Sequence, residues 1–354
     1  MTAPWKINMN SMTQLQPVTI FKDQFGREKR KLRISVTDRC NFKCVYCMPE
    51  HPEWMKKHNL LSFESLYNFC EFMVLLGIDQ IRITGGEPLI RQGVVHFIEQ
   101  LQQLRKLGLK RISMTTNGHY LKQYAQALKQ AGLDGINISL DSLDEAQFFQ
   151  LTQKQLQPVL EGIEAAKQAG FDIKINTVLI RGLNDQQIIP LTYWAQQQHF
   201  ELRFIEFMPL DGDQNWTKDS VVTEQEILTT LKTVFEVNIL CGQGASPARS
   251  YEVNGLPIGI ISTISNSFCG SCDRLRLNAQ GEFFNCLFAK KGLDLSKDIR
   301  SLKSTLAENE NPLDTLNMQN KLGSYIWQKE QGFHTITASS TSNTRKISMH
   351  MIGG

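Results

Sequence analysis

The stretch Arg33-Ile-Ser-Val-Thr-Asp-Arg-Cys-Asn-Phe-Lys-Cys-Val-Tyr-Cys47 joins a short β-branched run to three closely spaced cysteines. The run 33–37 has the length and composition of a β-strand. The cysteines follow at once, so they are expected in the loop at the carboxyl end of this strand. Parallel α/β folds carry their functional sites at that end. The stretch therefore predicts the first strand of an α/β fold and the place of its site.

The same strand pattern recurs up to residue 207, with amphipathic stretches of helical length in between. The expected strands are 33–37, 80–84, 111–115, 135–140, 172–179 and 201–207, and the expected helices are 62–76, 93–107, 121–131, 158–169 and 185–198. Four of these helices end at Gly77, Gly108, Gly132 or Gly170, each followed by an apolar residue, which is typical of a left-handed C-cap. Helical connections predict parallel strands. Six β–α units favour a barrel left open on one side or a doubly wound sheet, because a complete barrel needs eight.

The repeat is lost after about residue 211. Residues 223–234 and 307–331 are expected to be helical, and 246–264 to form short strands and turns. We expect a variable N-terminal extension over residues 1–24, a core over 25–240 and a smaller C-terminal α+β domain over 241–354.

Composition narrows the class of protein. The chain has 354 residues, of which 41% are hydrophobic and 21% charged, with a net charge of +3. No apolar run approaches the roughly 18 residues needed to cross a bilayer, and the first residues lack the apolar core of a signal peptide. We expect a cytoplasmic protein with no membrane and no nucleic-acid partner.

Six of the eight cysteines fall into two tight groups. Clustered cysteines in a chain without export signals indicate metal rather than disulfides. The two others, Cys70 and Cys241, stand alone and are expected to be small buried hydrophobes.

The first group, Cys40, Cys44 and Cys47, has three ligands and no fourth cysteine nearby. A four-iron cluster held by three thiolates keeps one iron open for a second molecule. A structural zinc site is the alternative and needs a fourth ligand. His51 and His58 are nearest but lack ligand-like spacing, so the group favours an iron–sulfur cluster.

The second group is Cys269, Cys272 and Cys286, again three ligands. Half of a zinc ribbon is the alternative, and that site needs another pair. Arg274 and Arg276 come shortly after Cys272 and project from one face of an expected strand. They would place two guanidinium groups beside an open iron, which suits a triphosphate and a base.

Basic residues also occur inside the expected strands, namely Arg33, Arg82, Lys174 and Arg203. A charged side chain in an apolar strand is costly unless it is paired or faces a wet cavity. An edge position would explain one such residue. Four together indicate an anionic substrate in the mouth of the barrel.

Two resemblances follow from these motifs. Cys-x3-Cys-x2-Cys with Tyr46 before the last cysteine, and Gly85-Gly-Glu-Pro88 after the second strand, resemble the radical S-adenosylmethionine (SAM) superfamily. Cys-x2-Cys-Asp-Arg-Leu-Arg-Leu over 269–277, with Cys286, Pro247-Ala-Arg249, Glu206-Phe-Met-Pro209 and a terminal Gly-Gly, resembles the GTP 3′,8-cyclase family of molybdenum cofactor biosynthesis. The resemblance covers residues 25–354 and implies an α/β fold with an open partial (β/α)6 TIM-like barrel, followed by the smaller domain with a second iron–sulfur cluster.

The resemblance also implies roles for particular residues. The first four-iron cluster would be held by Cys40, Cys44 and Cys47, and the second by Cys269, Cys272 and Cys286. The SAM site would include Tyr46, Gly86, Ser139 and Met208. GTP would be contacted by Arg33, Arg82, Thr115, Lys174, Arg203, Arg274, Leu275 and Arg276. Gly353 and Gly354 would form a tail that enters the active site and acts in catalysis with Arg274 and Arg276.

The activity implied is radical SAM-dependent conversion of GTP to 3′,8-cyclo-7,8-dihydro-GTP. The implied partners are GTP, an electron donor such as flavodoxin or ferredoxin, a downstream cyclic pyranopterin monophosphate synthase and a second copy of the chain in a homodimer. Two alternatives remain open at this point: a radical SAM enzyme that modifies a peptide with the help of an auxiliary cluster, and a non-catalytic iron–sulfur or zinc protein. One departure from the family is a missing glycine near Leu151-Thr-Gln-Lys154.

Overall fold

A computed structural model describes residues 21–213, 215–240, 245–304, 312–338 and 348–353. The strands described are β1 (Lys31–Ser35), β2 (Gln80–Thr84), β3 (Arg111–Thr116), β4 (Gly135–Ser139), β5 (Asp172–Leu179), β6 (Glu201–Glu206), β7 (Val237–Ile239), β8 (Arg249–Val253), β9 (Leu256–Ile261), β10 (Arg274–Leu277), β11 (Glu282–Phe284) and β12 (Leu293–Asp294). The α-helices described are α1 (Phe63–Leu75), α2 (Val94–Leu101), α3 (Leu121–Gln130), α4 (Glu145–Thr152), α5 (Gln157–Gln168), α6 (Ile188–Gln198), α7 (Glu224–Lys232), α8 (Ser296–Ser301), α9 (Pro312–Trp327), α10 (Phe333–Ala338) and α11 (Met349–Ile352).

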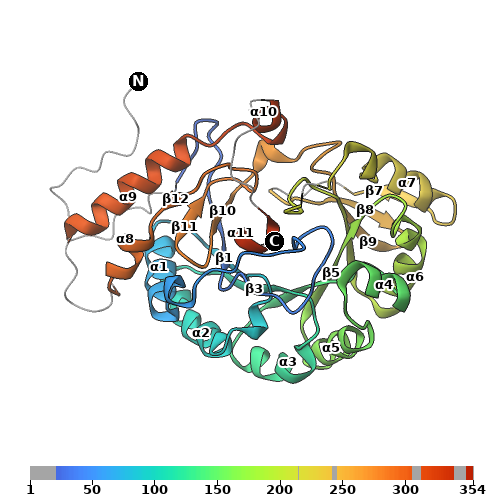
Figure 1. The fold of residues 1–354 in the computed structure, drawn as a ribbon, viewed down its shortest axis with the longest axis horizontal. Coiled ribbons are helices and arrows are strands. Elements are labelled where there is room, and N and C mark those ends of the chain that lie inside the picture. The colour runs from blue at the N-terminus through green and yellow to red at the C-terminus, as the bar shows by residue number, and fades with distance from the viewer. Residues whose placement is uncertain (1–20, 214, 241–244, 305–311, 339–347, 354) are drawn as a thin grey trace.

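All these strands belong to one sheet with the order β12-β11-β10-β1-β2-β3-β4-β5-β6-β9-β8-β7. The sheet curves into a barrel that is not closed, with α1 to α6 around its outside (Figure 1). The expected open partial barrel is therefore confirmed. Eight neighbouring strands, from β10 through β1–β6 to β9, run parallel, two more than the β–α repeat predicts. The repeat misses β9 and β10 because neither is followed by a helix of the series.

The strands expected up to residue 207 are confirmed within two residues at their ends. The four glycines expected to end helices all have a left-handed φ, from 74° at Gly170 to 112° at Gly108. Helix α4 was not expected. Its N-cap Asp144 accepts a hydrogen bond from the backbone N–H of Gln147 at 2.8 Å. Its C-cap, Gln153, has a left-handed φ of 58° without being a glycine.

Along β1, successive side chains point alternately into the apolar core and into the interior of the barrel. Leu32 and Ile34 are fully buried in the apolar core, whereas Arg33 between them points the other way. The same alternation along β2 sends Arg82 inward. The sheet thus presents charged side chains on its concave face. Among the described residues, no helix combines the length and apolar character that a membrane span needs.

Candidate active site

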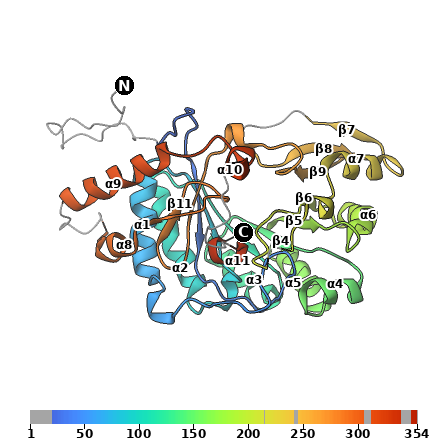
Figure 2. The same ribbon diagram turned by 45° about the horizontal axis from the view of Figure 1, so that its top comes forward.

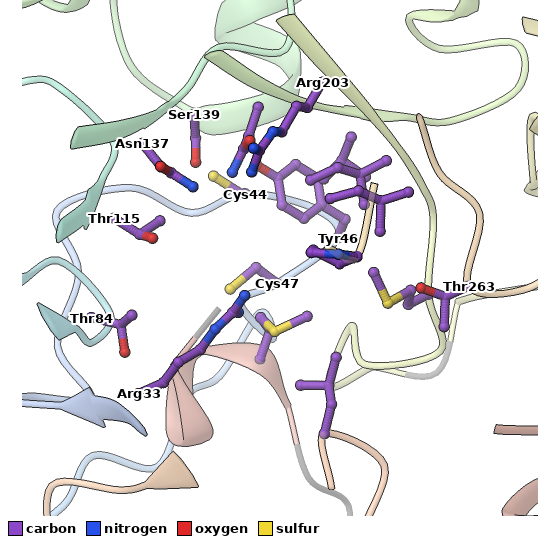
Figure 3. A pocket seen from close by; sticks show the side chains of 18 of the residues that line it. Arg33, Cys44, Tyr46, Cys47, Thr84, Thr115, Asn137, Ser139, Arg203 and Thr263 are labelled. Carbon is purple, nitrogen blue, oxygen red and sulfur yellow. The ribbon is translucent and has the colours of Figure 1, made fainter. Parts of the chain in front are cut away.

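Both cysteine groups line one pocket in the concave face of the sheet. All six cysteines contribute to it, although the two groups are more than 200 residues apart in the chain. The close view places Cys44, Cys47 and Tyr46 on one side of the space and Thr84, Thr115 and Ser139 around it (Figure 3). The two groups come together because β10 pairs with β1. The spacing of the cysteines within each group does not predict this pairing.

The Gly-Gly-Glu-Pro turn supports the first cysteine loop. The backbone N–H of Gly86 donates to the carbonyl oxygen of Thr37 at 2.6 Å, and that of Glu87 to the carbonyl oxygen of Arg39 at 2.8 Å. A Cβ atom on Gly86 would lie 2.3 Å from the same Arg39 oxygen. Only glycine fits here, because a side chain would push away the backbone that leads into Cys40.

Two buried carboxylates brace the neighbouring strand ends. Asp141 accepts a hydrogen bond from the Tyr46 hydroxyl at 2.7 Å and one from the backbone of Val178 at 2.9 Å. Glu87 accepts from the Thr116 hydroxyl at 2.8 Å and from the backbone N–H of Asn117 at 2.7 Å. Burial raises the pKa of Asp141 to about 6 and that of Glu87 to about 7. These groups hold the rim of the pocket in place.

The two cysteine groups have different electrostatic surroundings. Burial, and then the nearby Glu87, raises the pKa of the Cys40 thiol to about 12, and burial also raises the pKa values of Cys44 and Cys47. Burial acts in the same direction on Cys272, but the charge of Arg274 and other nearby cations outweighs it and lowers the pKa of that thiol to about 6. Cys272 of the second group therefore lies in a cationic environment.

A row of arginines crosses three adjacent strands. Arg276 of β10 lies in register with Arg33 of β1, which lies in register with Arg82 of β2. In the described parts of the chain no carboxylate forms an ion pair with these three side chains. Burial, followed by repulsion between neighbouring guanidinium groups, lowers the pKa of Arg33 and holds those of Arg82 and Arg276 at about 10. A row of cations without carboxylate partners, with Arg276 buried and Arg33 and Arg82 half-buried, is suited to an anion.

Three further cations surround the row. Arg274 lies over the ring of Phe268 at 4.7 Å. Arg203 forms an ion pair with Glu201 at 2.6 Å and still lines the pocket. Lys329 is buried, donates to the carbonyl oxygen of Asn285 and also faces the pocket. No motif singled out Lys329, since it lies in an ordinary helical stretch of the sequence.

The end of the described chain also reaches this pocket. Helix α11 lies within the open barrel (Figure 2), Met349 lines the pocket, and Gly353 is buried. Gly354 lies outside the described residues.

The structure gathers most of the expected site residues. The pocket lining includes Cys40, Cys44, Tyr46, Cys47, Gly86, Thr115, Ser139, Met208, Cys269, Cys272 and Cys286, together with Arg33, Arg82, Arg203, Arg274 and Arg276. Three described residues that were expected at the site are not in the lining. Lys174 pairs with Glu201, the Leu275 side chain is fully buried in the apolar core, and Gly353 contacts the lining residue Arg276 through its carbonyl oxygen. Asn117 was not assigned a role, although its side-chain amide lies 3.7 Å from the Cys40 sulfur.

The cysteine trios fit iron–sulfur clusters. Each trio lines the pocket and supplies three thiols. Among the described residues, no His, Cys, Asp or Glu side chains gather as a single metal ion requires. Zinc draws its ligands around one ion, whereas a cubane takes one thiolate at each of several irons. The three thiols of each trio match the thiolates that a cubane takes, one at each of three irons.

Comparison with known proteins agrees with this geometry. Residues 34–192 match the radical SAM superfamily, and residues 200–335 match the family described as Molybdenum Cofactor Synthesis C. The crystal structure of Streptococcus suis SuiB bound to S-adenosylmethionine is similar in fold, with a TM-score of 0.58 and 14% identity over 81% of this chain and 67% of that chain. The open barrel and the first cysteine loop define a radical SAM protein, a class that implies a four-iron cluster and SAM.

Two curated relatives are closer in sequence. A GTP 3′,8-cyclase of Streptomyces coelicolor is 43% identical over 79% of this chain and 84% of its own length. A GTP 3′,8-cyclase of Staphylococcus epidermidis is 37% identical over 95% of this chain and 99% of its own length. The chain belongs to the GTP 3′,8-cyclase family.

Proposed function

We propose that this chain converts GTP to 3′,8-cyclo-7,8-dihydro-GTP for molybdenum cofactor biosynthesis, using SAM as the source of the radical. One observation carries the proposal: a single pocket is lined by both cysteine trios and by the arginine row Arg276–Arg33–Arg82. A peptide substrate would not require three unpaired guanidinium groups, whereas a triphosphate does.

The first trio, Cys40, Cys44 and Cys47, would hold the cluster that accepts SAM, with Tyr46, Gly86, Ser139 and Met208 around the cofactor. When bound there, a four-iron cluster would supply the one-electron reduction of SAM on which radical SAM chemistry depends. The chain's own contribution here is positional. The Tyr46–Asp141 hydrogen bond and the packing of Gly86 hold the cysteine loop in place.

The second trio, Cys269, Cys272 and Cys286, would hold a second four-iron cluster, which would help to bind the guanine base. The arginine row, with Arg203, Arg274 and Thr115, would hold the triphosphate and ribose. Fixing both ends of GTP would hold C3′ of the ribose close to the SAM site and to C8 of the base. Closure by the tail at Gly353 would exclude water from the reacting carbon atoms.

Several expectations stay predictions. Lys174 would contact GTP only after leaving Glu201, and Leu275 only through its backbone, because its side chain is buried. The division near residue 240 is proposed from the loss of the β–α repeat. The homodimer, the electron donor and the downstream enzyme are proposed on the resemblance.

Anaerobic incubation of the reconstituted chain with GTP, SAM and a reductant tests the proposal. We expect deoxyadenosine together with a cyclised guanine nucleotide, and about eight irons per chain for two cubanes. Cys44→Ala is expected to abolish SAM cleavage, whereas Arg276→Gln keeps part of the cleavage and loses the nucleotide product. Unchanged GTP with abundant deoxyadenosine in the wild type would contradict the proposed substrate.

A further inference from the structure

Residues 22–28 form a tight turn just ahead of β1, with its ends joined by an antiparallel bridge. Gly26 has a left-handed φ of 75° in the turn. Oδ1 of Asp23 accepts hydrogen bonds from the backbone N–H groups of Phe25 at 3.0 Å and Arg27 at 3.1 Å. The turn therefore fixes one oxygen of the Asp23 carboxylate.

The other oxygen, Oδ2, binds two cations. It accepts from Nε of Arg27 and from Nζ of Lys29, each at 2.6 Å. The side chains of Asp23 and Lys29 are 0% exposed and that of Arg27 is 6% exposed. Although burial opposes it, the contacts with Lys29 and Arg27 lower the pKa of Asp23. The network is a buried carboxylate with two cations and hence a net positive charge.

Both cations direct their remaining N–H groups at the second cysteine pair. Nη1 of Arg27 donates to the carbonyl oxygen of Cys269 at 2.7 Å. Nζ of Lys29 donates to the carbonyl oxygen of Cys272 at 2.8 Å. These two carbonyl groups lie at the two ends of the short 3-10 turn that separates Cys269 from Cys272. The network therefore holds both ends of that turn.

Arg27 also fastens the segment that covers this turn. Its Nη1 donates to the carbonyl oxygen of Gln331 at 2.8 Å and its Nη2 to that of Glu330 at 2.9 Å. The next residue, Gly332, packs so closely that a Cβ atom there would lie 2.8 Å from Cβ of Cys269. The Arg27 guanidinium group thus links three segments: the turn at residues 22–28, the 3-10 turn between Cys269 and Cys272, and residues 330–332, which pack against that 3-10 turn.

We propose that Asp23, Arg27 and Lys29 are positioning residues for the second iron–sulfur site, an inference that rests on the proposed function. By holding the carbonyl groups of Cys269 and Cys272, the network keeps both thiols turned toward the pocket.

The test measures iron at each site rather than activity alone. The variants Arg27→Gln and Lys29→Met break the network. Arg27→Lys keeps the positive charge of the side chain but loses the planar guanidinium group and its several hydrogen bonds. Arg105→Gln is the matched control, because it breaks a two-bond ion pair with Asp134 at 2.8 and 2.9 Å that is not in the pocket. Each reconstituted protein is assayed for iron content, for iron release to a chelator and for the paramagnetic resonance signal that shifts on addition of SAM.

We expect Arg27→Gln and Lys29→Met to release iron from the second site about tenfold faster than the wild type. The signal that responds to SAM should persist, Arg27→Lys should fall between these variants and the wild type, and Arg105→Gln should behave as the wild type. Release at the wild-type rate in both Arg27→Gln and Lys29→Met, or equal loss of iron from both sites, would overturn the inference. A wild-type protein that binds only about four irons would instead refute the two-cluster proposal, and this inference with it.

Discussion

Nη1 of Arg276 donates a hydrogen bond to the carbonyl oxygen of Gly353, a residue 77 positions further along the chain. The contact places the tail directly beside the arginine row. Gly353 has a φ of 73°, and a Cβ atom there would lie 2.1 Å from the Thr84 hydroxyl oxygen. The tail therefore reaches Arg276 only because this residue has no side chain.

The first prediction concerns that contact. Gly353→Ala should displace the tail and release Arg276, which lowers formation of the cyclised nucleotide by about 100-fold because the substrate is misplaced. Cleavage of SAM should continue, so the ratio of deoxyadenosine to nucleotide product should rise. Gly182→Ala is the matched control, since Gly182 has the same φ of 73° with nothing within 4 Å of its added Cβ. An unchanged ratio in Gly353→Ala would show that the tail contact is dispensable.

The second prediction concerns the support of the first cysteine loop. Gly86→Ala should lower the free energy of unfolding by about 2 kcal/mol, because its Cβ would overlap the backbone at Arg39. The first cluster should be lost, so iron per chain should fall by about half. Gly270→Ala lies inside the other cysteine loop, where a Cβ meets nothing within 4 Å, and should retain all its iron. Thermal unfolding and iron analysis check both variants, and equal iron in the two would contradict the prediction.

The third prediction is that one substitution in the arginine row keeps or raises the stability of the ligand-free protein and lowers its affinity for GTP. Arg33→Met removes one half-buried cation from a group of mutually repelling guanidinium groups, so the free energy of unfolding without ligand should stay equal or rise by about 1 kcal/mol. GTP affinity should fall at least tenfold, since a charged hydrogen bond contributes about 1.5–3 kcal/mol. Calorimetry and anaerobic titration with GTP measure the two effects. Arg111→Met, which breaks an exposed pair with Asp172, should leave GTP binding unchanged, and unaltered binding in Arg33→Met would count against the substrate site.

The fourth prediction concerns how fast the cysteine thiols are alkylated in protein that holds no iron–sulfur cluster. A thiol reacts as its thiolate, so its alkylation speeds up as the pH rises through its pKa. Cys272, with a pKa of about 6, should react at its full rate at pH 7. Cys40, with a pKa of about 12, should stay almost unmodified there. Mass spectrometry of peptides alkylated between pH 5 and 9 compares them, and similar rates at pH 7 would show that the cationic surroundings do not act on Cys272.

Local patterns in the sequence were enough for the β–α repeat, the glycine caps and both cysteine groups. Each depends on residues a few positions apart, for which propensity and spacing are informative. The motif around Tyr46 predicted the radical SAM class for the same reason. Helix α4 was missed although Asp144 caps it, because its short sequence carries little periodicity.

The tertiary structure decided which of these residues act together. The pairing of β10 with β1 aligns Arg276 with Arg33 and brings the second cysteine trio to the pocket of the first. The pairing of β5 with β6 places Lys174 opposite Glu201. Tertiary packing also joins Asp23 to the carbonyl of Cys272 through Lys29. Such contacts link residues far apart in the chain. No local pattern encodes them, because strand register and burial are set by the packing of the whole sheet.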